Sequence, residues 1–442
     1  MAGKIGFAGT KQDTSAQPAL NVTTTNNGRV VGLSLVGYDP PSVDVLKSSG
    51  SVAQFGADNQ YPQHTIYQFE NSPTHAAICR FTATLIAGMG FVFEGATDAF
   101  KDNLGYQRSI DRIGKSLALD LKLHNGWAVQ VMWSADGTRI AKLKYEDFSF
   151  IRKEVNSDEE FTGTYLLYKY WKKGVTKNTP KVKPLPQFDP EAVFTYKTTP
   201  DGKKYLLDSE GNKIKVLDER GLPVLAQPNQ LFYYEGTSPG QKHYPKPMHI
   251  AADTAIQINC EFDAFHIGNI MNGMTPSLFI EAFGSIPDET EQDAFESAMQ
   301  KAFKGKKGKK SFIKFTDDYN NKTQITPLDI KNNETRYLEL MKFFIGEICS
   351  AHMLSSPVLA GIAGTSSLNN SGTEIEAAFR LYLDTVVLDM QDQLIEGFQE
   401  MFDQSGMTVK VGIIAKNPFG DVSTTTTNDG TTDVPSTPTT VQ

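Results

Sequence analysis

One segment constrains the fold more than any other: residues 248–271 form a predicted helix with apolar side chains on two opposite sides. At about 1.5 Å of rise per residue, this helix is about 36 Å long. With a turn of about 100° per residue, two apolar stripes emerge. The first contains Ala251, Ile258, Phe262 and Phe265, and the second contains Ile256, Cys260, Ile267 and Met271. A surface helix normally has one apolar stripe, so this helix is expected to lie between two neighbours.

Polar residues separate the two stripes along both edges of the helix. Asp253, Gln257 and Glu261 follow one edge, whereas Asn259, Asp263 and His266 follow the other. In a ring of identical subunits, the edge with Asp253, Gln257 and Glu261 is predicted to face a lumen. The alternative is a helix buried between two elements of its own chain, and the helix alone does not decide between them.

The segments around this helix predict an α+β protein. Residues 61–245 carry two helix patterns and several strand patterns, including a hairpin around Asp136-Gly137. Residues 274–331 mix strand and helix patterns, and they precede helices at 334–354 and 373–402. The predicted division is a partly disordered arm (1–60), an α+β domain (61–245), a long helix (246–273), a small αβ region (274–331), a second long helix (332–354), a glycine- and serine-rich loop (355–372), a closing helix with a strand (373–420) and a disordered tail (421–442).

Composition narrows the possible functions. The 442 residues carry a formal net charge of -8, whereas proteins that grip DNA phosphates are usually basic over at least one domain. Either nucleic acid is not a partner, or it passes without being held. The sequence has no run of about 20 apolar residues, so no membrane span is predicted and a soluble protein is expected. The three cysteines show no CxxC pairing and are predicted to be buried free thiols.

The order of these parts, with three local patterns, resembles the portal proteins of tailed bacteriophages of the HK97-like kind. MNGMTP (271–276) resembles the step where that family leaves its first stem helix. ICSAHMLSSPVLA (348–360) resembles the end of its second stem helix, and NNSGTEIEAAF (369–379) resembles the start of the helix after its tunnel loop. The family's C-terminal helical crown is expected to be reduced here, because only the polar tail follows residues 408–415.

The resemblance implies a portal fold, with a mixed wing domain (61–245), long stem helices, a small αβ clip (274–331) and a C-terminal amphipathic helix. It implies a homo-oligomeric ring of twelve subunits at one capsid vertex of the virion, assembled in the host cytoplasm. Double-stranded DNA would slide through this ring during packaging and ejection. The implied protein partners are the terminase large subunit, the head-tail connector or adaptor, and the major capsid and scaffolding proteins, with no membrane.

The resemblance also assigns two loops. Residues 358–372 would be a tunnel loop near the DNA, represented by Val358, Leu359, Ile362, Gly364 and Asn369; the alternative is an ordinary surface connection. The KGKKGKK segment would be a clip loop that contacts phosphates or acidic partners; the alternative is a solvated loop. Its lysines are Lys304, Lys306, Lys307, Lys309 and Lys310.

Catalytic motifs are missing from the sequence, so the chain is predicted not to be an enzyme and to need no cofactor. Gly305 to Ser311 fails the spacing of a phosphate-binding loop. The carboxylates at 288–293 are predicted to cap a helix rather than to bind a metal, because Asp288 and Glu291 have capping-box spacing. Two rival functions stay open at this point: another virion structural protein, such as a capsid or baseplate component, and a nucleic-acid-processing enzyme.

Overall fold

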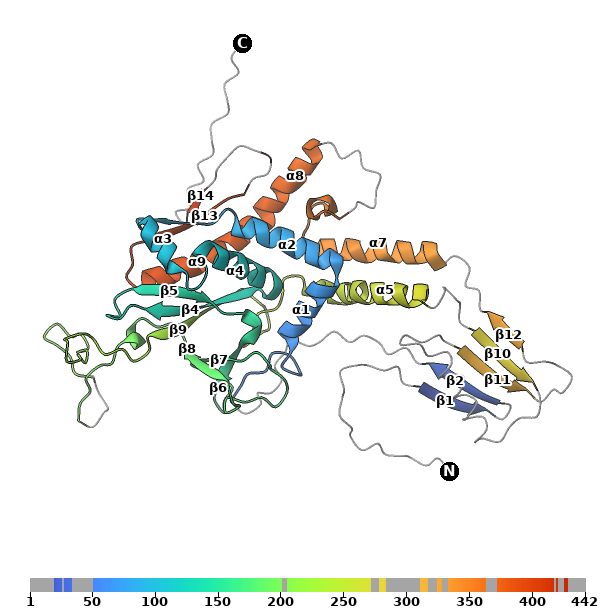
Figure 1. Ribbon diagram of the computed structural model, residues 1–442, viewed down its shortest axis with the longest axis horizontal. Coiled ribbons are helices and arrows are strands. Elements are labelled where there is room, and N and C mark those ends of the chain that lie inside the picture. The colour runs from blue at the N-terminus through green and yellow to red at the C-terminus, as the bar shows by residue number, and fades with distance from the viewer. Residues whose placement is uncertain are drawn as a thin grey trace, which may run out of the picture. The chain divides into compact units, whose positions relative to one another are not determined.

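The structure is a computed structural model that describes residues 20–25, 28–33, 51–200, 205–271, 278–283, 311–316, 324–327, 333–362, 372–416, 419 and 425–427. The chain divides into two compact units, Met1–Pro40 with Glu261–Met341 and Pro41–Cys260 with Lys342–Gln442. Helices and strands are mixed in the order drawn in Figure 1, so the predicted α+β class is confirmed. Within the described residues, none of the helices combines the length and the apolar character that a membrane crossing requires.

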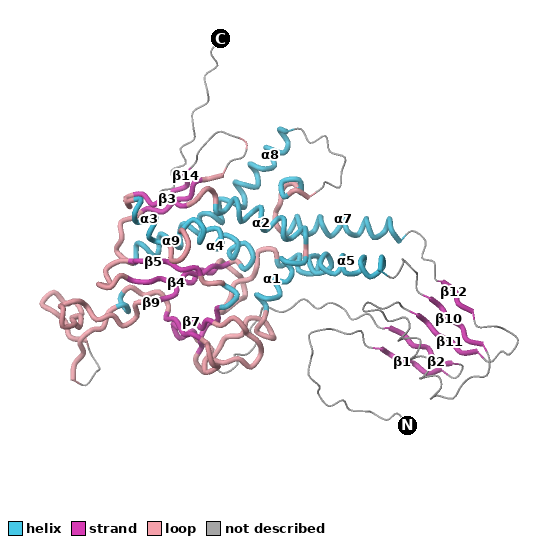
Figure 2. The backbone as a smooth tube through the Cα atoms, in the orientation of Figure 1, coloured by secondary structure: helices cyan, strands magenta, loops and turns pink. Residues whose placement is uncertain are grey.

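The larger unit contains three small sheets, which Figure 2 colours magenta. The central sheet has the order β5-β4-β9, and all its neighbours are antiparallel. The second sheet has the order β6-β7-β8 and the third has the order β14-β13-β3. Their strands are β3 (Phe91–Glu94), β4 (Gly126–Trp133), β5 (Ile140–Tyr145), β6 (Ile151–Val155), β7 (Phe161–Leu167), β8 (Lys183–Pro186), β9 (Asn229–Glu235), β13 (Lys410–Ile414) and β14 (Thr425–Thr427).

The helices described in the larger unit, apart from the two long helices treated below, lie beside and above the central sheet in the view of Figure 1. They are α1 (Tyr61–Asn71), α2 (Pro73–Ala87), α3 (Asp98–Leu104), α4 (Ile110–His124), α8 (Gly372–Tyr382) and α9 (Leu388–Gln404). Local sequence sets their ends. The Ser72 hydroxyl accepts a hydrogen bond from the His75 backbone N–H at the start of α2, and Pro73 occupies the first helical position. Asn125 closes α4 in the left-handed conformation, with φ of 58°.

The core of the larger unit lies between the central sheet and helices α4 and α9. Successive side chains of a strand point to opposite faces, so alternate residues of β4 face this core and the residues between them face the other side of the sheet. Trp127 stacks on Phe398 of α9 with ring centroids 5.5 Å apart, whereas the next residue, Ala128, belongs to a separate apolar cluster with Ile151 and Tyr165 of the second sheet. The C-terminal helix therefore completes a core that the first half of the chain begins.

Gly397 lets α9 approach the sheet closely, because a Cβ atom there would lie 2.4 Å from Trp127 Cζ2. Alanine normally gains up to about 1 kcal/mol over glycine in a helix, but overpacking a core costs about 1–3 kcal/mol. We expect Gly397→Ala to lower the free energy of unfolding by about 1–2 kcal/mol in urea denaturation. Gly346→Ala is the matched control, since that helical glycine has open space and should gain stability. Equal gains for both variants would contradict this account.

The two long helices are α5 (Asp253–Met271) and α7 (Asn333–Ala351), close to the predicted 248–271 and 334–354. A 3-10 turn at Ile250–Ala252 replaces the predicted first turn of α5. The helix predicted at 373–402 divides into α8, a π-helical turn at Leu383–Val387 and α9. Thr385 accounts for part of this irregularity, because its hydroxyl donates to the Leu381 carbonyl at 2.6 Å and competes with regular helix bonding.

The smaller unit contributes two sheets in the described residues. β1 (Leu20–Thr25) and β2 (Gly28–Leu33) form an antiparallel pair. β10 (Leu278–Phe283) pairs in parallel with β11 (Ser311–Thr316) and antiparallel with β12 (Gln324–Pro327). The helix predicted from Asp288 and the lysine loop at 304–310 lie outside the described residues.

Both predicted disordered ends contain structure. The arm at 1–60, predicted to be partly disordered, includes the β1-β2 pair, and the tail at 421–442, predicted to be disordered, includes β14, which pairs with β13. Residues 51–60, predicted as part of the arm, belong to the core of the larger unit. Phe55 stacks on Tyr244 with ring centroids 4.2 Å apart, and Val52 bridges to Glu154. Contacts between residues this far apart in the sequence cannot be predicted from amino-acid composition.

Within residues 194–200 and 205–225 the structure has isolated β-bridges rather than the regular strands expected from the strand patterns of residues 61–245. The bridges join Phe194 to Leu225, Tyr196 to Lys215 and Leu217 to Pro223. Asp208 and Asp218 set two turns ten residues apart, each accepting two backbone N–H groups at 2.9 Å through Oδ1. Aspartate is typical of such turns because its side chain bonds its own backbone locally.

Candidate subunit interface on the paired helices

The first half of α5 has one buried side and one open side. Ile256 and Cys260, from one predicted apolar stripe, are buried, and so are Ala252 and Ala255. On the other predicted stripe, Ala251 is exposed and Ile258 and Phe262 are half-buried. In this half of the helix the chain buries one predicted apolar stripe fully and the other only in part, and the side chains of Phe265, Ile267 and Met271 lie outside the described residues.

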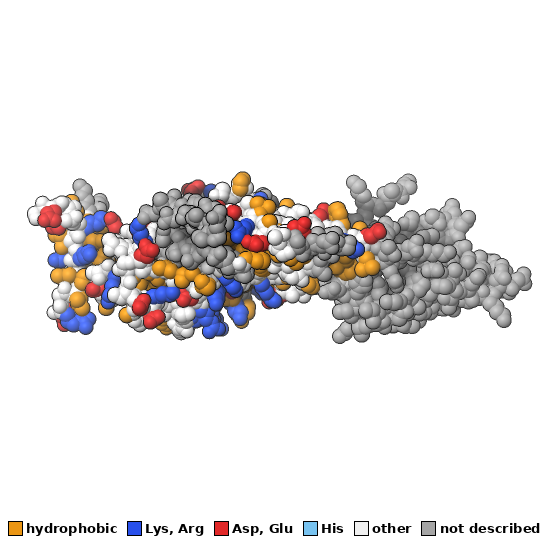
Figure 3. Space-filling view, turned by 90° about the horizontal axis from the view of Figure 1, so that it is seen from above, with side chains coloured by type: hydrophobic (Ala, Val, Ile, Leu, Met, Phe, Trp, Pro, Cys, Tyr) orange, Lys and Arg blue, Asp and Glu red, His pale blue; other side chains and the backbone are white. Residues whose placement is uncertain are grey.

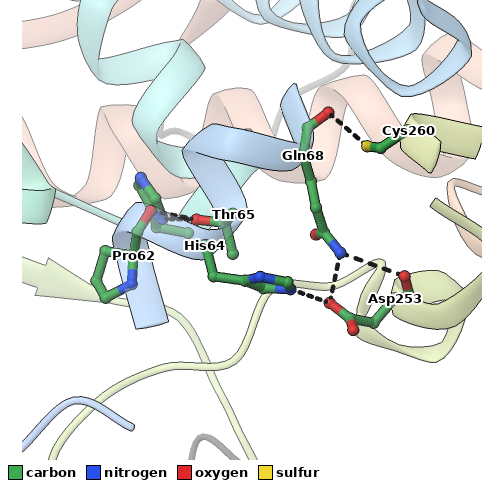
Figure 4. Close-up of polar contacts among 7 residues, drawn as sticks. Pro62, His64, Thr65, Gln68, Asp253 and Cys260 are labelled. Atoms are coloured by element: carbon green, nitrogen blue, oxygen red, sulfur yellow. Dashed lines mark hydrogen bonds and ion pairs between the residues drawn. The ribbon is translucent and has the colours of Figure 1, made fainter. Parts of the chain in front are cut away.

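A buried polar network fixes this orientation of α5, as Figure 4 shows. Gln68 Nε2 of α1 donates to Asp253 Oδ1 at 2.9 Å and to the Asp253 carbonyl at 3.2 Å. His64 Nε2 lies 3.1 Å from Asp253 Oδ1. Ser72 Oγ donates to Asn259 Oδ1 at 2.6 Å. Buried polar groups are retained at low cost only when they are bonded in this way, so the network sets which side of α5 faces inward.

The prediction that Asp253 faces a lumen is therefore wrong. Its exposed fraction is 7%, because α1 lies over it and bonds its carboxylate. Asn259, predicted on the other polar edge, is also buried by its bond to Ser72. Gln257 is half-buried and Glu261 is exposed, so these two remain on the open side of the helix. The periodicity of the helix predicted which residues share an edge, but it could not predict which polar residues of an edge are buried against α1.

Helix α7 carries large exposed apolar side chains. Leu338 is 62% exposed, Leu340 is 41% exposed and Phe343 is 58% exposed. Further along the same helix, Ile348 and Cys349 are buried in the main core. At about 100° per residue, Leu340 and Phe343 lie about 60° apart on one side of α7, whereas Leu338 points to another side. Scattered exposed apolar residues are ordinary, so Leu340 and Phe343 are the pair that fits a surface covered by another protein.

A groove of about 640 Å³ lies between the first half of α5 and the second half of α7. Its walls include Ala251, Thr254 and Ala255 from the first helix segment and Phe343 and Glu347 from the second. The lining is predominantly apolar and small, which favours an inserted apolar side chain over a charged ligand. Figure 3 shows orange apolar patches among acidic and basic side chains on one face of the molecule.

The predicted tunnel loop begins with anchored rather than projecting residues. Pro357–Ala360 form a 3-10 turn after α7. Val358 is half-buried, and the half-buried side chains of Leu359 and Ile362 lie against the main core. The expectation that these apolar residues reach towards DNA is therefore wrong, because the core holds them. Gly364 and Asn369 lie outside the described residues, as do Lys304, Lys306, Lys307, Lys309 and Lys310.

The structure also assembles a cluster that the sequence did not predict. His75 and Cys79 lie one turn apart on α2, His249 precedes the 3-10 turn at Ile250–Ala252, and His352 follows α7. His75 Nδ1 is 3.0 Å from His352 Nε2, and Cys79 Sγ is 3.7 Å from His75 Nδ1. Only the one-turn spacing of His75 and Cys79 was visible in the sequence. All three cysteines are buried free thiols, as predicted.

Burial controls the protonation of this cluster. It lowers the pKa of His75 to about 3, with a smaller contribution from the positive charge of Lys122. Burial likewise brings the pKa of His249 and of His352 well below the ordinary value. It raises the pKa of the Cys79 thiol to about 12. The histidines are therefore neutral at physiological pH, because a buried imidazolium would lose its hydration.

Comparison with known proteins adds a structural similarity. No family model matches the sequence, and no curated protein matches it either. A chain from the neck of a native gene transfer agent particle, computed with C12 symmetry, is 12% identical, with a TM-score of 0.49 over 85% of this chain and 88% of that chain. An HK97 family phage portal protein from Corynebacterium diphtheriae is 9% identical, with a TM-score of 0.41 over 77% of this chain and 90% of that chain.

The chain is structurally similar to phage portal and neck proteins. The sequence resemblance was to the same kind of protein. Because identity is so low, function has to be inferred from the chain's own residues. The buried side of α5, its open side and the exposed residues of α7 are the features that carry that inference.

Proposed function

We propose that the chain is one subunit of a portal ring, the channel at a single capsid vertex of a tailed double-stranded DNA phage. In this role the protein is structural rather than enzymatic. DNA would pass through the ring during packaging and ejection. The proposal rests on the order of the segments in the sequence together with the surface of the two long helices.

The observation that carries the proposal is the uncovered apolar surface on α5 and α7. Ile258 of α5 is only half-buried, and Phe343 of α7 is 58% exposed beside the groove. Fully burying a side chain of this size stabilises a protein by about 1.5–3 kcal/mol. Repetition of such a contact around a closed ring favours assembly of identical subunits, and closure leaves no apolar face exposed at an end.

The same helix supplies polar residues suited to a channel wall. Gln257 and Glu261 lie on the open side of α5, and the chain carries a formal net charge of -8. An acidic wall repels DNA phosphates, so it allows a duplex to slide without being gripped. In the proposed ring, Gln257 and Glu261 face the lumen, and Asp253 instead stabilises the subunit from inside.

The proposed partners follow from this role. The terminase large subunit supplies the energy for packaging, and a head-tail connector replaces it later. The major capsid and scaffolding proteins surround the ring in the virion, which assembles in the host cytoplasm. Lys304, Lys306, Lys307, Lys309 and Lys310 form a basic segment that we assign to the contact with an acidic partner or with phosphates. Gly364 and Asn369 belong to the proposed tunnel loop.

Negative-stain electron microscopy of the purified chain, combined with particle mass measurement, tests this function. We expect closed rings of about twelve subunits with a channel of at least about 20 Å, the width of a DNA duplex with its grooves and phosphates. Filaments, sheets or a closed shell would contradict the proposal and would favour a different virion component. If the purified chain stays monomeric, we would image it again after adding scaffolding and capsid protein. Absence of rings in that mixture would also contradict the proposed function.

A further inference from the structure

A second site lies in the interior of the larger unit, apart from the proposed interface. His75, Cys79 and His352 are all buried, and one potential ligand atom from each lies within 4.8 Å of the others. The ring of His249 is 4.6 Å from that of His75 and 4.7 Å from that of His352, between centroids. Four side chains from three distant segments therefore converge on one small volume.

The hydrogen bonding of this cluster is incomplete. His249 Nδ1 and His352 Nδ1 are buried without a hydrogen-bond partner in the described structure. A buried polar atom without a partner costs about 1–3 kcal/mol, so native proteins rarely keep two together without a reason. The hydrogen bond between His75 Nδ1 and His352 Nε2 gives a partner to only one nitrogen of each of these two rings. Without a further partner, the buried polar atoms of this cluster therefore make the fold less stable than apolar residues of the same size would.

The distances suit tetrahedral coordination. Zinc bonds of about 2.0–2.1 Å to nitrogen and about 2.3 Å to sulfur separate two nitrogens by about 3.3 Å, and nitrogen from sulfur by about 3.6 Å. The corresponding separations here are 3.0 Å between His75 Nδ1 and His352 Nε2 and 3.7 Å between Cys79 Sγ and His75 Nδ1. These two separations differ from the zinc values by a few tenths of an ångström, and the ligand atoms of Cys79 and His352 lie within 4.8 Å of each other. The latter pair and His249 would move closer together as the ion binds.

We propose that His75, Cys79 and His352, with His249 as the fourth ligand, bind one Zn²⁺ ion or a divalent transition metal of similar preference. Imidazole nitrogen and thiolate sulfur are the ligands that such metals select over Mg²⁺ and Ca²⁺. Binding forms a metal–sulfur bond and releases the Cys79 thiol proton to solvent. The charged groups that act on the cluster are Lys122 and Asp253, of opposite sign.

The consequence is a metal cross-link at the base of the two long helices. Cys79 and His75 belong to α2, His249 lies directly before the 3-10 turn that leads into α5, and His352 lies directly after α7. One ion would therefore join the three segments that set where both long helices leave the larger unit. This inference is independent of ring formation, because all four side chains belong to the same unit of a single chain.

The test uses the full chain, stripped of metal with a chelator and titrated with Co²⁺ in place of Zn²⁺. We expect about one Co²⁺ per chain, with the absorption of tetrahedral cobalt and a thiolate-to-cobalt charge-transfer band. Zn²⁺ should displace it, and elemental analysis should find about one Zn²⁺ per chain after dialysis. Cys79→Ser should abolish the charge-transfer band and weaken binding by at least about tenfold. His352→Gln should weaken it similarly.

Cys260→Ser and Cys349→Ser are matched controls, since both remove buried free thiols outside the proposed ligand set. We expect each to keep the charge-transfer band. Less than about a tenth of an ion per chain in the unaltered protein, without tetrahedral absorption, would overturn the proposal and leave a packed histidine cluster. Unchanged binding in Cys79→Ser would overturn it too. If Cys79→Ser does not fold, the unaltered chain still decides the outcome by its cobalt spectrum.

Discussion

Phe343→Asp is expected to convert rings into monomers without unfolding the subunit. The side chain is 58% exposed in the single chain, so the substitution should change the free energy of unfolding by only about 0.5 kcal/mol. In the ring, the same change removes a buried phenyl group and buries a carboxylate at each interface. These losses sum to about 4 kcal/mol per interface, which weakens association about a thousandfold. Mass photometry and urea denaturation measure the two effects separately.

Tyr170→Asp is the matched control for this prediction. Tyr170 is an aromatic residue of similar size and is 66% exposed, but it follows β7, away from the groove between α5 and α7. We expect this variant to form rings as the unaltered chain does. Rings that survive Phe343→Asp, or that are lost equally in both variants, would show that the surface on α7 is not the assembly interface.

Acidification from pH 7 to pH 5 is expected to destabilise the metal-free subunit strongly. Burial lowers the pKa of His75 and His124 to about 3, whereas an unfolded histidine has a pKa of about 6.5. Below pH 6.5 the unfolded chain therefore binds protons that the folded chain excludes. The stability contributed by these groups is complete above about pH 6.5 and is lost as pH falls towards about 3.

The magnitude follows from the same linkage. By pH 5, His75 and His124 each lower the free energy of unfolding by about 2 kcal/mol, and His249 and His352 act in the same direction. A loss of this size is comparable with the whole stability of many domains, about 5–15 kcal/mol. Urea denaturation of the Phe343→Asp chain at several pH values, with chelator present, measures it without contributions from assembly or bound metal.

Asp120 provides the control for the acid effect, because it acts in the opposite direction. Burial raises the pKa of its carboxyl well above the ordinary value, with a further contribution from Asp147. As pH falls, Asp120 therefore takes up a proton in the folded chain at a higher pH than in the unfolded chain. This proton uptake increases the free energy of unfolding as pH falls below the raised pKa. Asp120→Asn should steepen the loss between pH 7 and pH 5. A change of less than about 1 kcal/mol in that variant would contradict the account of the buried histidines.

Local patterns in the sequence were sufficient for the two long helices, the hairpin around Asp136-Gly137 and the order of the main segments. The alternation in β4, the capping serine before α2 and the length of α5 depend on neighbouring residues, so they are readable without a tertiary structure. The double apolar stripe on α5 was also readable; the structure buries Ile256 and Cys260 of one stripe and leaves Ile258 of the other half-buried. The π-helical turn at Leu383–Val387 was not predicted, although Thr385, whose hydroxyl donates to the Leu381 carbonyl, is visible in the sequence.

Tertiary structure alone decided which polar residues have partners. Asp253 and Glu261 occupy the same predicted edge of α5, yet Gln68 of α1 buries and bonds the first, whereas the second is exposed. Asn259, on the other edge, is buried by its bond to Ser72. His75 and His352 are 277 positions apart and meet only because α2 lies beside the end of α7. A single sequence specifies the periodicity of each element, since that depends on nearest neighbours along the chain. Burial, pKa shifts and possible metal ligation depend on contacts across the fold, and these exist only once the elements pack together.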